Sequence, residues 1–231
     1  QSSWLTLDVA PAALSIAVTS TAVAGQFEIS LYVTRAGDYN VRLFGGGDLL
    51  AGNWPAGTVV VGEVLVRVTP ALSSALTALV TDLNPRAVSG IASSFSVRSL
   101  DVYSNYQQYQ PSLGADAYVG VLTQLDDTNP ISTTGALSDN QDGTYLISYV
   151  LTRAGRYSLA VTLDTFALSG IPVNFTVIVV PGTVFPPACI IQPDTTELAS
   201  SVAGETVNFT IVARDQYNNL NSADSVSFTL V

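Results

Sequence analysis

The sequence predicts an all-β protein built from tandem β-sandwich domains, and three observations support this prediction. Hydrophobic residues make up 48% of the 231 residues, and most are Val, Ile, Leu and Ala mixed with abundant Ser and Thr. This composition favours pleated, half-buried surfaces over helices. Apolar and polar residues alternate in several short segments, which is the period of a strand with one buried face. Two motifs also recur at a spacing close to the length of one sandwich domain.

The expected strands are short and lie along the whole chain. Val207, Phe209 and Ile211 occupy alternate positions, which places them on one face of a strand. The same alternation occurs in residues 27–31 and 145–149. Strands are expected at residues 3–7, 27–31, 117–122, 145–149, 157–163, 207–212 and 225–230. The strands at residues 3–7 and 225–230 are expected to be equivalent, in their own repeats, to the strand at 117–122.

Turn sequences separate these strands. Thr-Arg-Ala-Gly occurs at residues 34–37 and again at 152–155. Each copy is expected to form a turn before a strand, with Gly155 free to take a positive φ. Pro-Gly at residues 181–182 and Phe-Pro-Pro at 185–187 mark a domain boundary. Because this linker is short, the repeats on either side of it are expected to have a restricted hinge.

Two internal matches show that the chain contains repeats. Residues 25–39 align with residues 143–157 at an offset of 118, and both contain Thr-Arg-Ala-Gly-x-Tyr. A second pattern, with Asp-x-Tyr-x-Asn at its end, starts at Gly90 and again at Gly204, an offset of 114. The two matches cover complementary halves of one unit. The implied period is close to the ~100 residues of an immunoglobulin-like sandwich.

This period divides the chain into one complete repeat and two partial ones. We expect the C-terminal part of a first repeat at residues 1–71, a complete repeat at 72–181 and the N-terminal part of a third repeat at 182–231. The sequence is either a window from a longer array, or its two partial repeats complete each other head to tail between molecules. Both alternatives are open, since an uncovered sandwich edge invites pairing with another chain.

The motifs resemble those of a filamin-type immunoglobulin repeat. Three segments resemble the second half of such a repeat: Asp-Asn-Gln-Asp-Gly-Thr-Tyr at residues 139–145, Thr-Arg-Ala-Gly-Arg-Tyr at 152–157 and Ser-Gly-Ile-Pro at 169–172. The segment Ala-Arg-Asp-Gln-Tyr-Asn-Asn at residues 213–219 resembles part of the first half. The resemblance to the filamin/ABP280 repeat family implies tandem immunoglobulin-like β-sandwiches.

One turn departs from the pattern of the family. A Tyr-Gly-Asn turn is usual there, but Ser104 and Asn218 replace its glycine in the two copies. Asn tolerates the left-handed backbone region and Ser tolerates it less. The turn is therefore expected to be reshaped.

The resemblance also implies a way of binding partners. Repeats of this family bind by adding a strand to the edge formed by strands C and D, a mode that relies on main-chain hydrogen bonds. In the complete repeat this edge involves residues 118–122 and 131–137. The residues expected to form it are Tyr118, Gly120, Leu122, Ile131 and Thr133.

The composition excludes several classes of protein. There are 8 basic residues, all arginines, against 18 acidic ones, and the net charge is -10. A nucleic-acid binder needs a cationic surface, which this chain does not supply. Without histidine or lysine there is no Ser-His-Asp system, Schiff base or P-loop lysine. We expect no enzyme activity, no cofactor and no metal site. No apolar run reaches the ~20 residues of a membrane-spanning helix, so no membrane span is expected within this chain.

Two acidic segments are expected to be structural. Residues 139–143 superficially resemble a calcium loop, but Ser138 and Tyr149 stand where the first and last ligands belong. A turn is therefore expected there. Asp126 and Asp127 are expected to be a solvated loop pair rather than an acid/base dyad.

Two sequons, Asn174-Phe175-Thr176 and Asn208-Phe209-Thr210, are candidate glycosylation sites. If Phe175 and Phe209 face the core, strand alternation turns Asn174 and Asn208 towards solvent. A plain exposed asparagine is the alternative at each position.

Cys189, the single cysteine, lies in the expected first strand of the third repeat. A small buried hydrophobe is its expected role. A disulfide to a region or chain outside this sequence is the alternative.

These observations lead to an expected function. We expect a structural or adhesive extracellular protein, such as a surface fibre or cell-adhesion ectodomain of an alga or other protist. Its expected partners are proteins, through self-association or head-to-tail assembly. The alternative is an intracellular filamin-like scaffold that crosslinks cytoskeletal filaments, and a third possibility is that the repeats are spacers in a larger enzyme.

Overall fold

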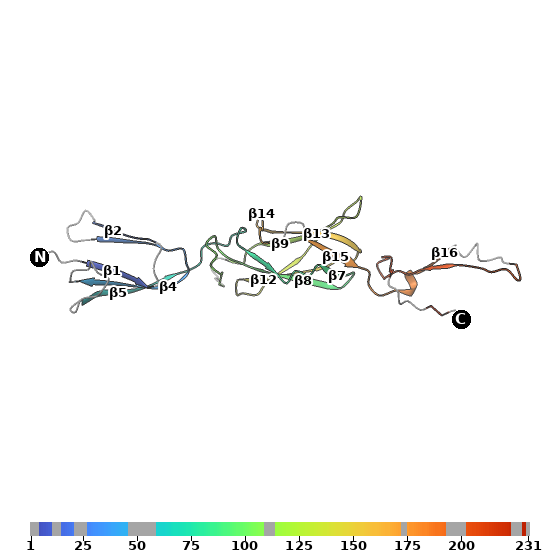
Figure 1. The fold of residues 1–231 in the computed structure, drawn as a ribbon, viewed down its shortest axis with the longest axis horizontal. Helices are drawn as coiled ribbons and strands as arrows, with labels where there is room; N and C mark the ends of the chain where they lie inside the picture. Colours follow the sequence, from blue (N-terminus) through green and yellow to red (C-terminus); the bar gives the residue numbers. More distant parts are fainter. Residues whose placement is uncertain are drawn as a thin grey trace. The chain divides into compact units, whose positions relative to one another are not determined.

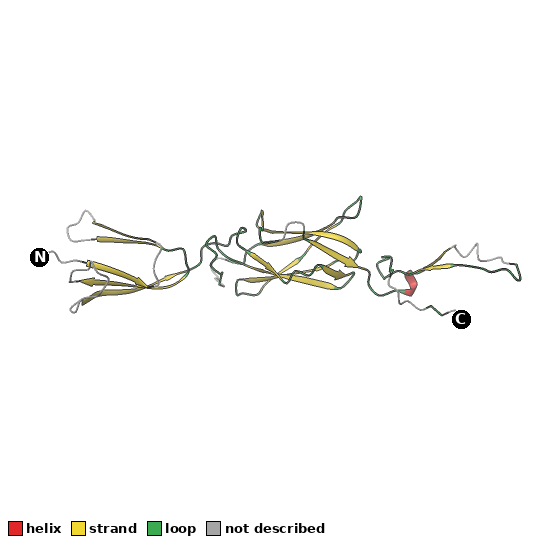
Figure 2. Cartoon of the chain, in the orientation of Figure 1, coloured by secondary structure: helices red, strands yellow, loops and turns green. Residues whose placement is uncertain are grey.

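A computed structural model describes residues 5–10, 15–20, 27–45, 59–108, 114–171, 175–192, 202–222 and 228–229. These residues form two compact units. One unit spans Gln1–Ser73 with Leu100–Gln107, and the other spans Ser74–Ser99 with Gln108–Val231. Apart from one short 3₁₀ turn, η1 (Pro186–Ala188), the regular elements of the described residues are all strands (Figures 1 and 2). No helix among the described residues is long and apolar enough to cross a membrane.

The second unit contains a complete two-sheet sandwich. One sheet has the order β10-β9-β13-β15-β7, with β14 paired to β13, and the other has the order β11-β12-β8-β6. All pairs are antiparallel except β15 with β7. The strands are β6 (Leu79–Thr81), β7 (Arg86–Val88), β8 (Ala92–Arg98), β9 (Tyr118–Gln124), β10 (Ser132–Thr134), β11 (Ala136–Asp139), β12 (Thr144–Val150), β13 (Gly155–Leu163), β14 (Phe166–Ala167) and β15 (Thr176–Val180).

The core of this sandwich follows from strand alternation. In β12 the side chains of Tyr145, Ile147 and Tyr149 are buried, as the sequence predicts. Seventeen buried hydrophobic residues from both sheets form one cluster, and Phe175 packs against it. Ile147 has no exposed surface, and it packs so closely against Gly135 that a side chain at position 135 would collide with it. A single dry core of this size stabilises the repeat through burial of apolar area.

The first unit repeats the back half of this sandwich. Its strands are β1 (Leu5–Ala10), β2 (Ser15–Ser20), β3 (Phe27–Tyr32), β4 (Gly37–Gly45) and β5 (Val59–Val68). The order β1-β4-β5 matches β9-β13-β15, and β2-β3 matches β11-β12. Leu5 pairs with Gly45 as Tyr118 pairs with Leu163. The predicted equivalence of the N-terminal strand and the strand at residues 117–122 is thus confirmed by its pairing.

The last segment repeats the front of the sandwich. Strand β16 (Ile190–Gln192) pairs with β17 (Thr210–Val212) as β6 pairs with β8. The predicted strand at residues 207–212 begins only at Thr210. Val207 and Phe209 are 46% and 39% exposed, so the prediction that Phe209 faces a core is wrong for the described structure. The reason is that no second sheet covers this segment among the described residues. Most of the predicted strand at residues 225–230 lies outside them.

Candidate functional site

The candidate site forms where the two recurring motifs meet. The Thr-Arg-Ala-Gly turn at residues 152–155 receives the loop at residues 215–219, and both belong to the second unit. In the first unit, the turn at residues 34–37 receives the loop at residues 101–105 in the same way. We call these segments the receiving turn and the aspartate loop, and each pair of them a clamp.

An aspartate closes the aspartate loop on itself. One carboxylate oxygen, Asp215 Oδ1, accepts hydrogen bonds from the backbone N–H groups of Tyr217 and Asn219, each at 2.9 Å. The backbone N–H of Asn218 donates to the carbonyl of Asp215 at 3.0 Å. Asn218 has a φ of 69°, in the left-handed region. This compact turn sets the side chain of Asn219 in a fixed direction.

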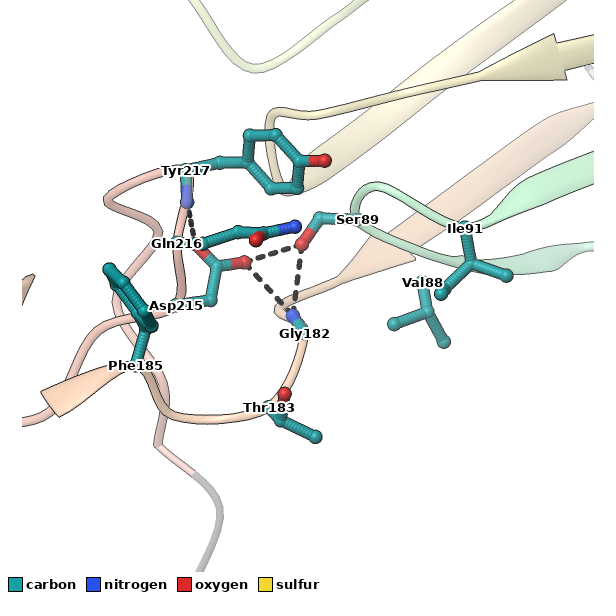
Figure 3. A pocket seen from close by; sticks show the side chains of 9 residues that line it. All are labelled: Val88, Ser89, Ile91, Gly182, Thr183, Phe185, Asp215, Gln216 and Tyr217. Carbon is teal, nitrogen blue, oxygen red and sulfur yellow. Dashed lines mark hydrogen bonds between the residues drawn. The ribbon is translucent and has the colours of Figure 1, made fainter.

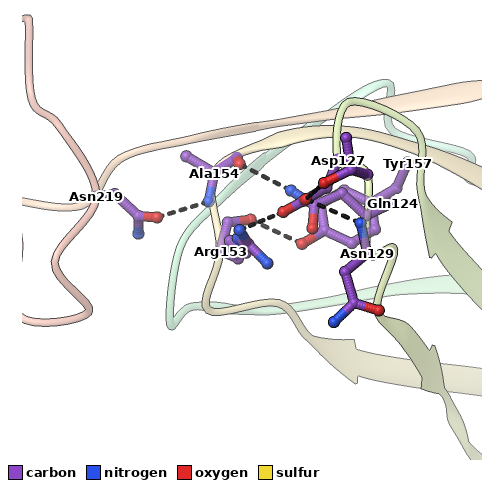
Figure 4. A network of polar contacts seen from close by, with 8 residues as sticks. Gln124, Asp127, Asn129, Arg153, Ala154, Tyr157 and Asn219 are labelled. Carbon is purple, nitrogen blue, oxygen red and sulfur yellow. Dashed lines mark hydrogen bonds and ion pairs between the residues drawn. The ribbon is translucent and has the colours of Figure 1, made fainter.

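The carboxamide of Asn219 binds the main chain of the receiving turn (Figure 4). Its Oδ1 accepts a hydrogen bond from the N–H of Ala154 at 2.8 Å, and its Nδ2 donates to the carbonyl of Thr152 at 2.8 Å. The same Nδ2 also donates to Asp215 Oδ2 at 2.8 Å. A carboxamide supplies one acceptor and two donors in one plane, so it can satisfy all three groups at once.

The receiving turn is held in shape by its own repeat. The hydroxyl of Tyr157 donates to the carbonyl of Arg153 at 2.9 Å, and the Arg153 guanidinium pairs with Asp127. Gly155 has a φ of 140°, and a Cβ there would lie 3.1 Å from Gln124 Nε2. The shared Thr-Arg-Ala-Gly-x-Tyr motif therefore codes for a turn whose shape is supported by contacts within its own repeat.

The linker between the repeats is the third part of the clamp (Figure 3). Asp215 Oδ2 accepts hydrogen bonds from the N–H of Gly182, at 2.9 Å, and from the Ser89 hydroxyl. The N–H of Gly182 also donates to Ser89 Oγ at 2.9 Å, and Asn221 Nδ2 donates to the carbonyl of Gly182 at 2.7 Å. One carboxylate thus joins the loop, the linker and the end of β7.

The Asp215 carboxyl is 1% exposed, and its protonation equilibrium reflects two opposing effects. Burial opposes ionisation and raises its pKa, but hydrogen bonds from Asn219, Ser89 and the Gly182 N–H outweigh burial and hold the pKa well below 3.8. In the first clamp burial is likewise outweighed by bonds from Asn105, Ala71 and Tyr103, which lower the pKa of Asp101. Both groups are therefore buried anions that hydrogen-bond donors stabilise.

The first clamp repeats the contacts of the aspartate loop, the receiving turn and the linker, whereas the Ser89 contacts are described only in the second clamp. Asn105 Oδ1 accepts from the Ala36 N–H at 2.8 Å, and Asn105 Nδ2 donates to the Thr34 carbonyl at 2.7 Å and to Asp101 Oδ2 at 2.8 Å. The remaining equivalent contacts are Ala71 N–H to Asp101 Oδ2 at 2.9 Å, Gln107 Nε2 to the Ala71 carbonyl, and Tyr39 hydroxyl to the Arg35 carbonyl at 2.9 Å. Two sequence-divergent junctions therefore carry one hydrogen-bond pattern.

Comparison with known proteins identifies the complete repeat. The Filamin/ABP280 repeat family model matches residues 73–174. This segment is a filamin-type repeat. Both clamps involve it, since the loop at residues 101–105 and the turn at residues 152–155 lie within its sequence.

Solved structures share the all-β fold over most of the chain. InvD of Yersinia pseudotuberculosis is 19% identical with a TM-score of 0.52, and the alignment covers 95% of this chain and 62% of InvD. The Escherichia coli adhesin FdeC is 15% identical with a TM-score of 0.54, and the alignment covers 94% of this chain and 63% of FdeC. The chain thus spans less than two thirds of either structure. No curated protein sequence matches the chain.

The structure keeps the turn that the sequence predicted to be reshaped. Ser104 and Asn218 have φ values of 66° and 69°, which is the conformation that glycine would take in a filamin-type repeat. The loop hydrogen bonds are the same in both copies. That expectation was wrong because the aspartate carboxylate holds the loop closed whichever residue stands at this position.

The structure describes one of the two predicted glycosylation sites. Asn208 is exposed just before β17. Asn174 lies outside the described residues, while Phe175 and Val177 beside it face the core as expected. Glycosylation of both asparagines stays a prediction.

The predicted strand-addition edge is narrower than the sequence indicated. Strand β9 pairs with β13 along its whole length and with β10 at residues 121–123, so Leu122 faces Thr133 across a ladder. The side chains of Tyr118 and Leu122 are buried, and Gly120 is buried with them, while Ile131 is 37% exposed. The outer edge on this side is therefore β10. Strand addition there stays a prediction.

Cys189 and the acidic pair lie in local turns. Cys189 follows η1, is partly buried, and its thiol donates to the Phe185 carbonyl at 3.6 Å. It is not in a strand, since β16 begins one residue later, and an external disulfide stays a prediction. Asp126 and Asp127 each pair with an arginine, Arg156 and Arg153, rather than standing as a solvated pair.

The sequence showed the clamp residues only as markers of the repeat. Asp-x-Tyr-x-Asn and Thr-Arg-Ala-Gly were recognised separately, with no indication that they meet. The sequence does contain one signal. The polar residues of both motifs are the same in their two copies, while the strand residues around them differ between the copies. This difference indicates that the polar residues make a specific contact and do not merely face solvent.

The positive φ of Ser104 predicts a stabilising substitution. A non-glycine residue in the left-handed region costs roughly 1–2 kcal/mol, and glycine removes this cost but adds freedom to the unfolded chain. We expect Ser104→Gly to raise the free energy of unfolding by about 0.5–1 kcal/mol in urea denaturation. The matched variant Asn218→Gly is expected to change it less, because asparagine tolerates this region. A Ser104→Gly variant that is less stable than the parent would contradict this reading of the turn.

The buried Asp215 carboxylate predicts an acid-sensitive clamp. The pKa of Asp215 is lower in the folded than in the unfolded state. The stabilisation of the folded state by this carboxylate is therefore complete above about pH 3.8, the unfolded pKa, and is lost as the pH falls towards the folded pKa. We expect Asp215→Asn to lose about 2–3 kcal/mol of unfolding free energy at neutral pH. It should also show a shallower loss of stability in acid. Urea unfolding from neutral pH to about pH 2 tests this, and equal slopes for parent and variant would refute it.

Proposed function

We propose that the protein is a non-enzymatic structural and adhesive component of a cell surface, built from filamin-type repeats. The observation that carries the proposal is the clamp, in which the asparagine, the receiving turn and the linker make equivalent hydrogen bonds at both junctions. Catalytic sites do not need such junctions, whereas a protein that positions binding surfaces along an array does. The fold shared with the adhesin FdeC supports the adhesive role.

The surface of the complete repeat supports self-association as part of this function. Strands β6 to β15 contain no Asp or Glu except Asp139, at the end of β11. On the outer face of β9, β13 and β15, the exposed or half-exposed side chains other than Arg156 are small or neutral, and they include Val119, Ala160 and Ile178. Arg156 lies opposite Ile178 on this face, and its charge is paired with Asp126. The negative charge of the repeat lies in its loops instead. A broad neutral sheet face can approach a second copy without charge repulsion.

A second partner surface follows from the edge of the same sheet. Strand β10 is three residues long and forms the outer edge beside β9. An extended peptide can add to such an edge through main-chain hydrogen bonds. We place heterologous partners there and self-association on the neutral face.

The surface location can be tested on native material. We expect antibodies to label intact cells, and glycopeptide mass spectrometry to find a glycan on Asn208, which is exposed. Thr210→Ala removes the sequon but keeps Asn208, so it should abolish the modification and serves as the matched control. If Asn174 and Asn208 are both unmodified and the protein is found in the cytosolic fraction, the extracellular proposal is wrong and the intracellular scaffold is favoured.

Self-association through the neutral face has a separate test. Ala160 is exposed on β13 opposite Val121. We expect Ala160→Glu to weaken association about tenfold or more in sedimentation equilibrium, because each copy then carries a charge in the contact. Ala160→Thr, which stays neutral and suits a strand, should associate like the parent. Equal association of all three proteins, or a parent that remains monomeric, would rule this face out.

A further inference from the structure

We propose that the clamps couple the folding of successive repeats, so that a repeat and the aspartate loop of its successor are stabilised together. This inference rests on the clamp geometry and not on the surface location or the adhesive role. It makes the array a cooperative structure rather than a row of independent domains.

The first argument is the position of the loops in the chain. Residues 101–105 lie between β8 and β9 of the complete filamin-type repeat, yet Leu100–Gln107 belong to the first compact unit. Their partners there are the turn residues Thr34 and Ala36 and the linker residue Ala71. A segment of one repeat therefore completes the polar bonding of the preceding one.

The second argument is the chemistry of the contact. The receiving turn offers one main-chain N–H and one carbonyl, from Ala154 and Thr152 in the second clamp. The side chain of Asn219 meets both and also donates to the Asp215 carboxylate. Aspartate at this position has no donor and adds a second anion, and serine is too short to reach two groups. Asparagine stands at this position in both clamps, so the interface is specified by sequence.

The third argument is that one buried charge joins three segments. The Asp215 carboxylate accepts bonds from the loop, from the linker residue Gly182 and from Ser89. Removing any one segment leaves a buried carboxylate with fewer donors, which costs more than an average surface hydrogen bond. The bonds are therefore made or lost together.

The fourth argument is a packing contact beside the second clamp. The ring of Tyr217 covers Gly90 so closely that a methyl group at Gly90 would overlap the ring. The N–H of Gly90 donates to the carbonyl of Leu151 at 2.8 Å, immediately before the receiving turn. The aspartate loop thus contacts the receiving turn through Asn219, and through Tyr217 it contacts Gly90, which is hydrogen-bonded to the residue before that turn. The loop and the turn are therefore packed together.

Hydrogen–deuterium exchange on the full chain tests the coupling. In Asn219→Ala we expect the amide of Ala154 to exchange about tenfold faster or more, because its acceptor is removed. Asn129→Ala is the matched control, since Asn129 lies in an exposed loop and its side chain is outside the clamp. Unchanged protection of Ala154 in Asn219→Ala would overturn the assignment of the contact.

A core variant then measures whether the stabilities are linked. Val161 is 1% exposed in β13, so Val161→Ala destabilises the complete repeat. With the clamp intact, this change should also speed exchange at the loop amides of Tyr217 and Asn219. In the double variant with Asn219→Ala, the additional effect of Val161→Ala on the Tyr217 amide should vanish. An effect of the same size in both backgrounds would show independent folding and overturn the proposal.

The first clamp guards against a folding defect of one variant. Asn105→Ala should expose the amide of Ala36 to exchange by a similar factor, since the two contacts are equivalent. If Asn219→Ala does not fold, this second variant decides the outcome. Wild-type protection of Ala36 in a folded Asn105→Ala protein would count against the coupling.

Discussion

A buried aspartate carboxylate at each repeat junction is the interaction on which the arrangement of loop, linker and turn depends. Asp101 and Asp215 are each about 1% exposed and accept several hydrogen bonds from the loop and the linker. Burying an anion is expensive unless its lone pairs are satisfied. Satisfying them requires the loop to close, the linker to pass beside it and the asparagine four residues later to face the turn. The carboxylate thus converts a local turn into a junction.

The remaining stability has a different physical origin in each part of the molecule. The complete repeat relies on a continuous apolar core of seventeen buried residues. In the described part of the first unit the buried hydrophobic residues are Tyr39, Val41 and Leu100, and the strands β16 and β17 bury no hydrophobic residue fully. The described hydrophobic core therefore lies mainly in the complete repeat, and each junction adds a buried polar cluster to it. In the complete repeat the acidic residues fit the same pattern, because all but Asp139 lie outside strands β6 to β15.

Much of the fold could be predicted from sequence because it depends on local patterns. The period-two alternation placed Tyr145, Ile147 and Tyr149 in the core, and the internal match predicted that the strand containing Leu5 is equivalent to β9. The clamp could not be predicted in this way, since Asn219 and Ala154 are 65 residues apart and only the folded chain brings them together. Ser104 shows the same limit. Its propensity argued for a reshaped turn, but the hydrogen bonds of Asp101, both within the loop and from the distant Ala71 N–H, hold the left-handed conformation.

The most direct test of the account is detection of the clamp hydrogen bonds in solution. Through-hydrogen-bond NMR couplings between the amide nitrogens of Ala36 and Ala154 and the side-chain carboxamide carbons of Asn105 and Asn219 report these contacts individually. The account predicts measurable couplings at both junctions together with slow exchange of the two amides. Absent couplings with rapid exchange at both alanines would contradict it.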